Sequence, residues 1–401
     1  MKICIIANFY PPYFFGGERA YQREAEGLVG RGHKVTVITS SPDNKSYHEE
    51  LNMVQVYRFR PLNIYPPYQA EHKPLLLKPL FHGIDFWNIH SYREIKNILK
   101  IINPDVVYIH NFKGLSLSVF GSVNKLGLPS VFCVNDFSLI CPKADLLRAS
   151  GQICGRPLPI CHIYANVQRN IFGRNKPDLV VSPALFTLDK LKNAGFFKEV
   201  QTKREIIGVD RCKNMSDKDY DITNILYVGN VSKHKGVHIL VQAFTKIKSQ
   251  SVRLHIVGKG KYLDELKRLC EGDSRINIYG FVSDEILDDL RQKSNIAVVP
   301  SIWYDMAQGA ICESFSYGTP VIGSRIGGIP EYIDEGYNGL LFEPGNSEEL
   351  KIILERLANN SQELKRLEEG ALESSTRYNT EQHIDRLEII FSDLIKKRMN
   401  I

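Results

Sequence analysis

Short uninterrupted apolar runs alternate along the first half of the chain with longer segments whose apolar residues recur every three or four positions. Such short runs, bounded by Gly, Pro, Asn or Asp, are typical of strands buried on both faces of a parallel sheet. In the first half they lie at 3–7, 34–39, 54–59, 106–110, 130–134 and 179–182. The helical periodicity between them, as at 18–29 and 91–102, predicts helices. This alternation predicts an α/β fold with a doubly wound parallel sheet.

The same alternation restarts near residue 224 and predicts a second α/β unit. Its expected strands lie at 224–229, 254–257, 276–279, 296–299, 320–323 and 339–342. The polar stretch 202–220 lies between the two series, and we expect it to be a linker.

The end of the chain is expected to be helical. Two helical segments follow Glu348, with an interruption at 377–379, and the last helix, at 383–397, has a one-sided apolar stripe. The pattern as a whole predicts one domain over 1–205, a second over 206–375 and a terminal helix within 376–401.

The composition is that of an ordinary globular protein, with 43% hydrophobic and 24% charged residues among 401. The opening apolar run is too short for a signal peptide, and no window approaches 18 unbroken apolar residues. Eight cysteines in so long a chain do not indicate a disulfide scaffold. We therefore expect a cytoplasmic protein.

The net charge of +6 is unevenly distributed. Residues 1–205 hold 26 Lys and Arg against 16 Asp and Glu, or +10, and residues 206–401 hold 25 against 29, or −4. The basic first half favours an anionic partner, such as lipid head groups or a pyrophosphate carrier. A chance variation in surface charge is the alternative. No basic-aromatic array accompanies the charge, so nucleic acid is not an expected partner.

Two acids near the end of the second unit are the strongest chemical signal. Asp305 closely follows an apolar strand, and Glu313 lies eight positions later, beyond a Gln-Gly turn. Residues from Gly309 onward read as the start of a helix, where the free N–H groups of Gly309, Ala310 and Ile311 favour an anion. Glu313, about one turn further on, is placed to accept hydrogen bonds from vicinal hydroxyls.

Glycine-containing loops follow the first strand of each unit. Gly16 and Gly17 precede the first helix, and Lys235-Gly236 follows the strand that ends at Gly229. Glycine lets the backbone approach a phosphate closely, and a lysine ammonium suits an anion.

These motifs, in this order and over about residues 1–395, resemble the retaining family 4 glycosyltransferases. The resemblance implies the GT-B fold: two Rossmann-like domains facing a cleft, with a C-terminal helix crossing back to the first. It implies a metal-independent transferase with no cofactor, whose co-substrate is a nucleotide-diphosphate sugar. The Asp-x-Asp spacing around Asp217, Asp219 and Asp221 falls in the expected linker and not in a cleft loop.

The resemblance also assigns roles. Lys235 would stabilise the leaving diphosphate, Glu313 would hold the ribose hydroxyls, and Asp305 would contact the donor sugar. Gly16 and Gly17 would approach the phosphate, while the backbone at Phe281 and Val282 would read the edge of the nucleobase.

Three positions depart from the family pattern. Asp305 replaces a Glu, Asn230 replaces an Arg that grips the diphosphate, and Asn135 replaces a His beside the transferred sugar. Asn cannot titrate, but the reaction implied by the resemblance passes the acceptor proton to a donor phosphate oxygen. Lys233 or Arg325 are alternatives for the missing Arg.

Some neighbouring positions stay open. Asp136 is the nearest alternative polar contact to Asn135, and His110 is either a second candidate or a satisfied core histidine. The set Cys141, Cys154, Cys161 and His162 has zinc-ligand chemistry but lacks a tight Cys-x-x-Cys pair, so we expect packing roles.

The expected function is transfer of a sugar to a glycan or lipid-linked acceptor in surface polysaccharide assembly. The proline-rich apolar segments 65–68 and 74–81 indicate an acceptor or membrane-contact region, or packing under a long loop. The basic half is consistent with peripheral contact with an anionic membrane. Because of the three departures, a non-catalytic scaffold stays open, and a sugar-nucleotide epimerase is a remoter alternative.

Overall fold

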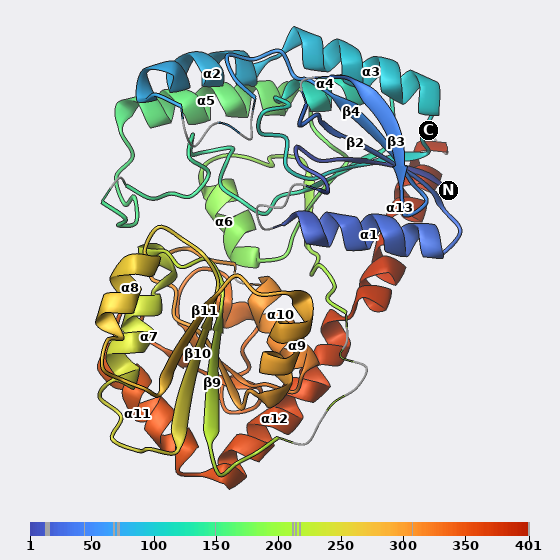
Figure 1. The fold of residues 1–401 in the computed structure, drawn as a ribbon. Coiled ribbons are helices and arrows are strands. Elements are labelled where there is room, and N and C mark those ends of the chain that lie inside the picture. Colours follow the sequence, from blue (N-terminus) through green and yellow to red (C-terminus); the bar gives the residue numbers. More distant parts are fainter. Residues whose placement is uncertain are drawn as a thin grey trace. The chain divides into compact units, whose positions relative to one another are not determined.

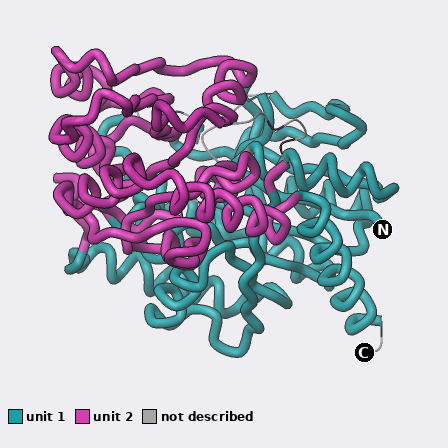
Figure 2. The backbone as a smooth tube through the Cα atoms, turned by 90° about the horizontal axis from the view of Figure 1, so that it is seen from below, with its two compact units in different colours: residues 1–146, 155–208, 380–401 teal, residues 147–154, 209–379 magenta. Residues whose placement is uncertain are grey.

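The computed structural model folds into two compact units (Figure 2). Unit 1 comprises residues 1–146, 155–208 and 380–401, and unit 2 comprises 147–154 and 209–379. The structure describes residues 1–12, 17–43, 45–66, 69, 73–148, 150–210, 212, 215, 218–306 and 308–399.

Unit 1 is built on an eight-stranded sheet with the order β3-β4-β2-β1-β5-β6-β7-β8. β3 runs antiparallel to β4, and the other neighbouring strands are parallel. The strands are β1 (Lys2–Ile6), β2 (Lys34–Ser40), β3 (Tyr47–Leu51), β4 (Val54–Phe59), β5 (Val106–Ile109), β6 (Ser130–Cys133), β7 (Leu179–Ser182) and β8 (Gln201–Arg204).

Helices cover both faces of this sheet (Figure 1). They are α1 (Glu18–Gly30), the short 3-10 helix η2 (Leu75–Leu77), α2 (Lys78–Phe86), α3 (Ile89–Ile102), α4 (Ser118–Lys125), α5 (Pro159–Arg174), α6 (Leu185–Asn193) and α13 (Thr380–Met399).

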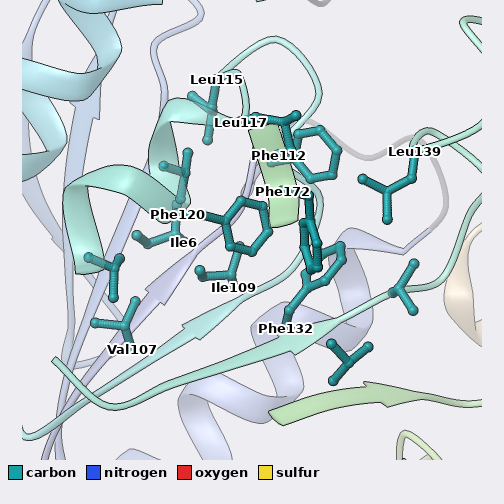
Figure 3. Close-up of a cluster of buried hydrophobic side chains, with 14 of the residues drawn as sticks. Ile6, Val107, Ile109, Phe112, Leu115, Leu117, Phe120, Phe132, Leu139 and Phe172 are labelled. Atoms are coloured by element: carbon teal, nitrogen blue, oxygen red, sulfur yellow. The ribbon is translucent and has the colours of Figure 1, made fainter. Parts of the chain in front are cut away.

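The larger core of unit 1 lies between the sheet and helices α3 to α5. Its centre is aromatic: the ring of Phe120 meets those of Phe132 and Phe172 edge to face, with centroids 5.0 and 5.2 Å apart (Figure 3). Edge-to-face packing is favourable because the positive ring edge meets the negative ring face. Val107 and Ile109 of β5 complete this face of the sheet. The buried strands are therefore held from this side by large, rigid side chains.

Unit 2 contains a six-stranded parallel sheet with the order β11-β10-β9-β12-β13-β14. Numbered within the unit, the order is 3-2-1-4-5-6, which is that of dinucleotide-binding folds. The strands are β9 (Thr223–Val228), β10 (Val252–Val257), β11 (Ile276–Gly280), β12 (Ile296–Val299), β13 (Val321–Ser324) and β14 (Gly339–Phe342).

Helices again lie on both faces of the sheet of unit 2 (Figure 1). They are η3 (Lys233–Lys235), α7 (Val237–Phe244), α8 (Leu263–Leu269), α9 (Asp284–Lys293), α10 (Gln308–Ser316), η4 (Ile329–Glu331), α11 (Ser347–Ala358), α12 (Ser361–Ser375) and η5 (Thr376–Tyr378).

The last helix, α13, returns from unit 2 to pack on unit 1. Its buried face joins α1 and the strands of unit 1 in one apolar cluster, to which Ile384, Leu387, Ile390 and Phe391 belong. These are members of the stripe that the sequence predicts.

A buried polar network also ties α13 to unit 1. His383 contacts Glu24 at 2.9 Å and Glu205 at 3.1 Å, and Arg386 donates to Glu205 at 2.6 Å. Burial alone would raise the pKa of Glu24, but His110 and His383 lower it to about 2. Burial alone would lower the pKa of His383, but hydrogen bonds to Glu205 and Glu24 raise it. The paired charges make the position of α13 on unit 1 specific.

The predicted fold is confirmed: both units have Rossmann-like sheets, parallel apart from the edge strand β3 of unit 1, and a C-terminal helix crosses back to the first. Two strands of unit 1 were not predicted from the sequence pattern. β3 and β8 are sheet-edge strands of mainly polar residues, so they show no apolar run. The prediction that residues 202–204 belong to the linker is wrong, because they form part of β8.

Replacing Leu387 by Ala tests whether α13 is part of the core of unit 1. Leu387 is fully buried, so its removal should lower the free energy of unfolding by about 2–5 kcal/mol, the range for buried leucine truncation. Ile389→Ala is the matched control on the same helix, because Ile389 is 61% exposed. Urea unfolding of both variants checks this, and equal stabilities would contradict the packing of α13.

Candidate functional site

The strand order of unit 2 reverses between β9 and β12, which are direct neighbours in the sheet. Ligands of open α/β sheets bind outside the carboxyl ends of the strands at such a switch point. Two segments leave the sheet there: residues 229–236, after β9, and residues 300–306, after β12. Lys235 and Asp305 lie on these two segments.

Glycines let the backbones of these loops approach one another. Gly236, with φ of +71°, lies so near Pro300 that an added Cβ would be 1.7 Å from its carbonyl oxygen. A Cβ on Gly258 would lie 1.8 Å from the Gly229 carbonyl oxygen. Real side chains do not fit at such distances, so these positions require glycine. The loops after β9, β10 and β12 are thus fixed to each other.

Lys235 and Asp305 form an ion pair at the switch point. The Lys235 Nζ lies 2.6 Å from the Asp305 Oδ2, and the Ser301 hydroxyl donates to the same oxygen at 2.6 Å. The Asp305 side chain is 8% exposed and that of Lys235 25% exposed, so the ammonium is the more accessible partner. The Lys235 Nζ also lies 5.1 Å from the centre of the Trp303 ring.

The main chain around Asp305 is equally constrained. Its carbonyl accepts a hydrogen bond from the Gly328 N–H at 2.8 Å, and a Cβ on Gly327 would lie 2.4 Å from that carbonyl oxygen. Burial, with the charge of Asp305 adding to it, raises the pKa of the nearby Tyr227 hydroxyl. Tyr227 therefore stays neutral and donates to the Asn230 carbonyl at 2.8 Å.

Helix α10 begins directly after this segment. The first N–H groups of a helix have no partner within it and carry its positive dipole end. At Gly309 an added Cβ would meet nothing within 4 Å, so space is open beside the helix start, whereas Ile311 is fully buried. An anion beside Gly309 and Ala310 would thus meet backbone donors.

Glu313 lies just over one turn into α10, as the sequence predicts. It forms an ion pair with Arg291 of α9 and is 27% exposed. Arg291 has no signal in the sequence, because nothing in the spacing of the two residues joins α9 to α10. The pair fixes the direction of the Glu313 carboxylate.

Phe281 follows β11 at the same edge of the sheet. Its side chain is 69% exposed, and the Lys259 Nζ lies 4.8 Å from the ring centre. The neighbouring Val282 packs partly on Leu226, Val257 and Leu290. An exposed aromatic ring beside a partly anchored backbone is suited to a flat ring ligand.

Asn230 stands where the resemblance leads us to expect an Arg, and Lys233 and Arg325 are the alternatives to that Arg. Asn230 is exposed, and its carbonyl accepts hydrogen bonds from the Tyr227 hydroxyl and the Ser232 N–H. Arg325 lies 3.2 Å from Glu335 and 3.3 Å from Glu343. Two acids therefore pair with Arg325, whereas Lys233 of η3 is exposed.

The expected residues of unit 1 gather at the carboxyl ends of its central strands. Asn135 donates to the Tyr21 hydroxyl at 2.8 Å, and a Cβ on Gly17 would lie 3.1 Å from the same oxygen. Asp136 accepts from Asn111 at 3.2 Å and from the Ser138 N–H at 2.8 Å. Gly16 lies outside the described residues.

His110 is a core residue. It is fully buried, with its Nε2 2.9 Å from the Glu24 Oε2 and its ring against those of Tyr21 and Tyr108. Of the two interpretations left open by the sequence, the structure supports the buried one.

Within the described part of the chain, no three His, Cys, Asp or Glu side chains gather as a metal site would require. Cys141, Cys154 and Cys161 are partly buried free thiols. No described helix is long and apolar enough to span a bilayer.

Comparison with known proteins places the chain in a family. Residues 16–200 match the family model described as Glycosyltransferase Family 4, and residues 222–360 match that described as Glycosyl transferases group 1. Together the two models cover both units. The chain belongs to the family 4 glycosyltransferases of GT-B fold.

Individual relatives have low sequence identity to this chain but match it over most of its length. An uncharacterized 42.6 kDa protein in the cps region of Klebsiella pneumoniae is 26% identical, covering 82% of this chain and 87% of its own. An alpha-monoglucosyldiacylglycerol synthase of Acholeplasma laidlawii is 22% identical over 99% and 98%. The structure of the Anabaena protein HepE in complex with UDP has a TM-score of 0.74 at 18% identity, covering 98% of this chain and all of the other.

The glycine contacts at the switch point predict the effect of Gly236→Ala. Both Gly236 and Gly272 have positive φ, so Ala costs about 1–2 kcal/mol at either through backbone strain. At Gly236 the new Cβ must also displace Pro300, which adds roughly 1–3 kcal/mol, the range for overpacking.

Gly272→Ala is the control, because a Cβ there meets nothing within 4 Å. Urea unfolding of the two variants should show the larger loss for Gly236→Ala. Equal losses would mean that the loops do not require this close approach.

Proposed function

We propose that this protein is a retaining, metal-independent glycosyltransferase that moves a sugar from a nucleotide-diphosphate donor to a glycan or lipid-linked acceptor. The family membership supports sugar transfer. The observation that carries the finer proposal is the Lys235 ammonium at the switch point, paired with Asp305, which lies three residues before the start of α10. Together these supply a fixed positive charge and free backbone donors where a diphosphate would lie.

Unit 2 is the proposed donor-binding unit. The diphosphate binds the Lys235 ammonium, with Lys233 as a second positive charge. It also accepts hydrogen bonds from the backbone N–H groups of Gly309 and Ala310. Glu313, oriented by Arg291, accepts hydrogen bonds from the ribose hydroxyls. The nucleobase lies against Phe281 and the backbone at Val282. The UDP complex of the structural neighbour HepE supports a nucleotide in such a fold.

Asp305 is proposed to act on the sugar through its pairing with Lys235. In the free protein its carboxylate is held by Lys235 and Ser301. A diphosphate competes for the same ammonium, so donor binding weakens the pair and turns the carboxylate towards a sugar hydroxyl. The Asp305 carboxylate, on a side chain one methylene shorter than Glu, thereby becomes able to accept a hydrogen bond from that hydroxyl when the donor is bound.

In the proposed reaction, the bond between the anomeric carbon and the diphosphate oxygen breaks, and the acceptor oxygen bonds to that carbon on the same face. The electron pair leaves with the diphosphate, which also accepts the acceptor proton. Lys235 stabilises the charge that develops on the leaving group, which is commonly the largest electrostatic contribution. Asn135 donates to Tyr21, so it serves as a positioning group and not as a base.

Unit 1 is the proposed acceptor-binding unit. It carries the basic excess of the chain, and the polar residues Asn135 and Asp136 closely follow its strand β6. The relative named alpha-monoglucosyldiacylglycerol synthase supports a lipid-linked acceptor, and we retain surface polysaccharide assembly as the setting.

Donor turnover tests the proposal directly. The full chain is incubated with uridine- and guanosine-diphosphate sugars, with and without a chelator, and release of nucleoside diphosphate is measured. We expect release from one class of donor, unchanged by the chelator. Binding without any turnover, with or without candidate acceptors, would favour the scaffold alternative, and an altered sugar still on its nucleotide would identify an epimerase.

The ion pair predicts the behaviour of Asp305→Asn. Loss of a hydrogen bond to a charged group costs about 1.5–3 kcal/mol, so turnover should fall roughly ten- to hundredfold. Affinity for the nucleoside diphosphate should not fall, because Lys235 loses the carboxylate that competes for it.

The control for this variant is Ser301→Ala, which removes a hydroxyl donor but keeps the ion pair, and which should retain turnover within a few-fold. Calorimetry and steady-state kinetics measure both properties. A parallel loss of diphosphate affinity in Asp305→Asn would contradict the role given to Asp305.

A further inference from the structure

One face of the unit 1 sheet carries polar residues near the amino ends of β2 and β4. Thr36 pairs with Cys4 on one side and with Gln55 on the other, and Tyr57 pairs with Ile38. Cys4 and Ile38 belong to the apolar cluster that includes side chains of α3, so the polar residues share that face. Strands inside a parallel sheet are normally apolar on both faces. The hydroxyls of Thr36 and Tyr57 have no hydrogen-bond partner among the described residues, and we call Thr36, Gln55 and Tyr57 the polar floor.

A pocket with a volume of about 460 Å³ lies over the polar floor. Its lining adds Lys2 and Lys34, the first residues of β1 and β2, and the exposed aliphatic side chains of Met53 and Ile101. We call it the amino-edge pocket. Because it lies at the amino ends of the strands, it is separate from Asn135 and the other residues that follow their carboxyl ends.

Two lysines face each other at this pocket. Lys2 and Lys34 are partners in the ladder between β1 and β2, so their side chains leave the same face from strands about 4.8 Å apart. Both are exposed, and neither forms an ion pair with an acidic side chain in the described part of the chain. Like charges at neighbouring positions repel each other, and an anion between the two ammoniums would remove that repulsion.

The acids near the pocket have other partners. Asp105 accepts the main-chain N–H at the start of β1 at 2.6 Å. Glu50 accepts from the side chain of Gln55, and Glu388 contacts the His33 ring at 2.5 Å. The free charges that the pocket offers to a ligand are therefore positive.

The turn between β3 and β4 places a strained residue on the pocket. Asn52 and Met53 at its centre have φ of +50° and +64°. Two-residue turns of this kind favour Asn followed by Gly, and a Met in the left-handed region carries backbone strain. The Met53 side chain is 70% exposed, so packing in the core does not compensate for that strain. Strain retained at a position that lines a pocket points to contact with a ligand.

We propose that the amino-edge pocket binds a small organic phosphate with a hydroxylated body. The phosphate lies between Lys2 and Lys34, and the hydroxyls exchange hydrogen bonds with the polar floor. A purely apolar body would leave the groups of the floor unpaired, which is costly, so a hydroxylated one is favoured. Met53 and Ile101 take the C–H groups of the ligand. This site goes beyond the proposed sugar transfer, since binding at the amino ends of the strands requires neither donor nor acceptor.

Calorimetric titration of the full chain tests the proposal. The probes are glucose 6-phosphate and glycerol 3-phosphate, compared with glucose, inorganic phosphate and octyl phosphate. We expect at least one of the two hydroxylated phosphates to bind more tightly than each of the three comparison compounds. The same ligand should raise the melting temperature, because it binds only the folded protein.

Four variants locate the binding. Lys2→Met and Lys34→Met should each weaken it roughly tenfold or more, through loss of a charge-assisted hydrogen bond. Lys192→Met is the matched control, because Lys192 is an exposed lysine of α6 in the same unit. Met53→Gly should also weaken binding, while the melting temperature of the free protein does not fall, because glycine relieves the strain. A role of Met53 in the turn alone would leave the affinity unchanged.

Lys235→Met should retain this binding, because the proposed donor site belongs to unit 2. Three results would overturn the proposal: neither hydroxylated phosphate binds more tightly than inorganic phosphate, octyl phosphate binds more tightly than both, or binding is lost in Lys235→Met and kept in Lys34→Met. Donor turnover of Lys34→Met is recorded alongside and should equal that of the wild type. Failure of this proposal is thereby distinguished from failure of the transferase proposal.

Discussion

A carboxylate that is almost wholly buried needs a cation, and in unit 2 Asp305 has Lys235. An unpaired charge at this depth would be strongly destabilising, so the pair fixes both residues at the switch point of the sheet. The ammonium is the partner that reaches solvent. The same interaction that neutralises Asp305 therefore presents a positive charge at the site. An anionic ligand that bound Lys235 would compete with Asp305, and the proposed diphosphate would in this way release the carboxylate.

The backbone makes this pairing possible. Gly236 lies against Pro300, and Gly327 lies against the main chain of Asp305, so the loops that carry the two charged residues have almost no room to shift. Preorganisation of this kind holds a charge in place before the ligand arrives, and no reorganisation is needed during reaction. Arg291 does the same for Glu313 on the next helix. The main chain that carries these charged side chains is thus held in place at one edge of the sheet.

The sequence predicts the parts of this arrangement that leave a local pattern. Buried parallel strands appear as apolar runs, so both sheets could be inferred, while the polar edge strands β3 and β8 could not. Lys235, Asp305 and Glu313 could be found because they follow strands or begin helices within family-like motifs. Arg291 and Ser301 could not, because their importance comes from tertiary contact with Glu313 and Asp305 and not from spacing. The burial of His110 likewise depends on Glu24, 86 positions away in the chain.

We propose that Lys235 binds the donor diphosphate without a divalent metal. Calorimetric titration of nucleoside diphosphate into the wild type and Lys235→Met, in the presence of a chelator, tests it most directly. We expect wild-type binding under these conditions and a roughly ten- to hundredfold weaker affinity in Lys235→Met, from the loss of about 1.5–3 kcal/mol. Equal affinities in the two proteins, or wild-type binding that appears only after magnesium or manganese is added, would contradict it.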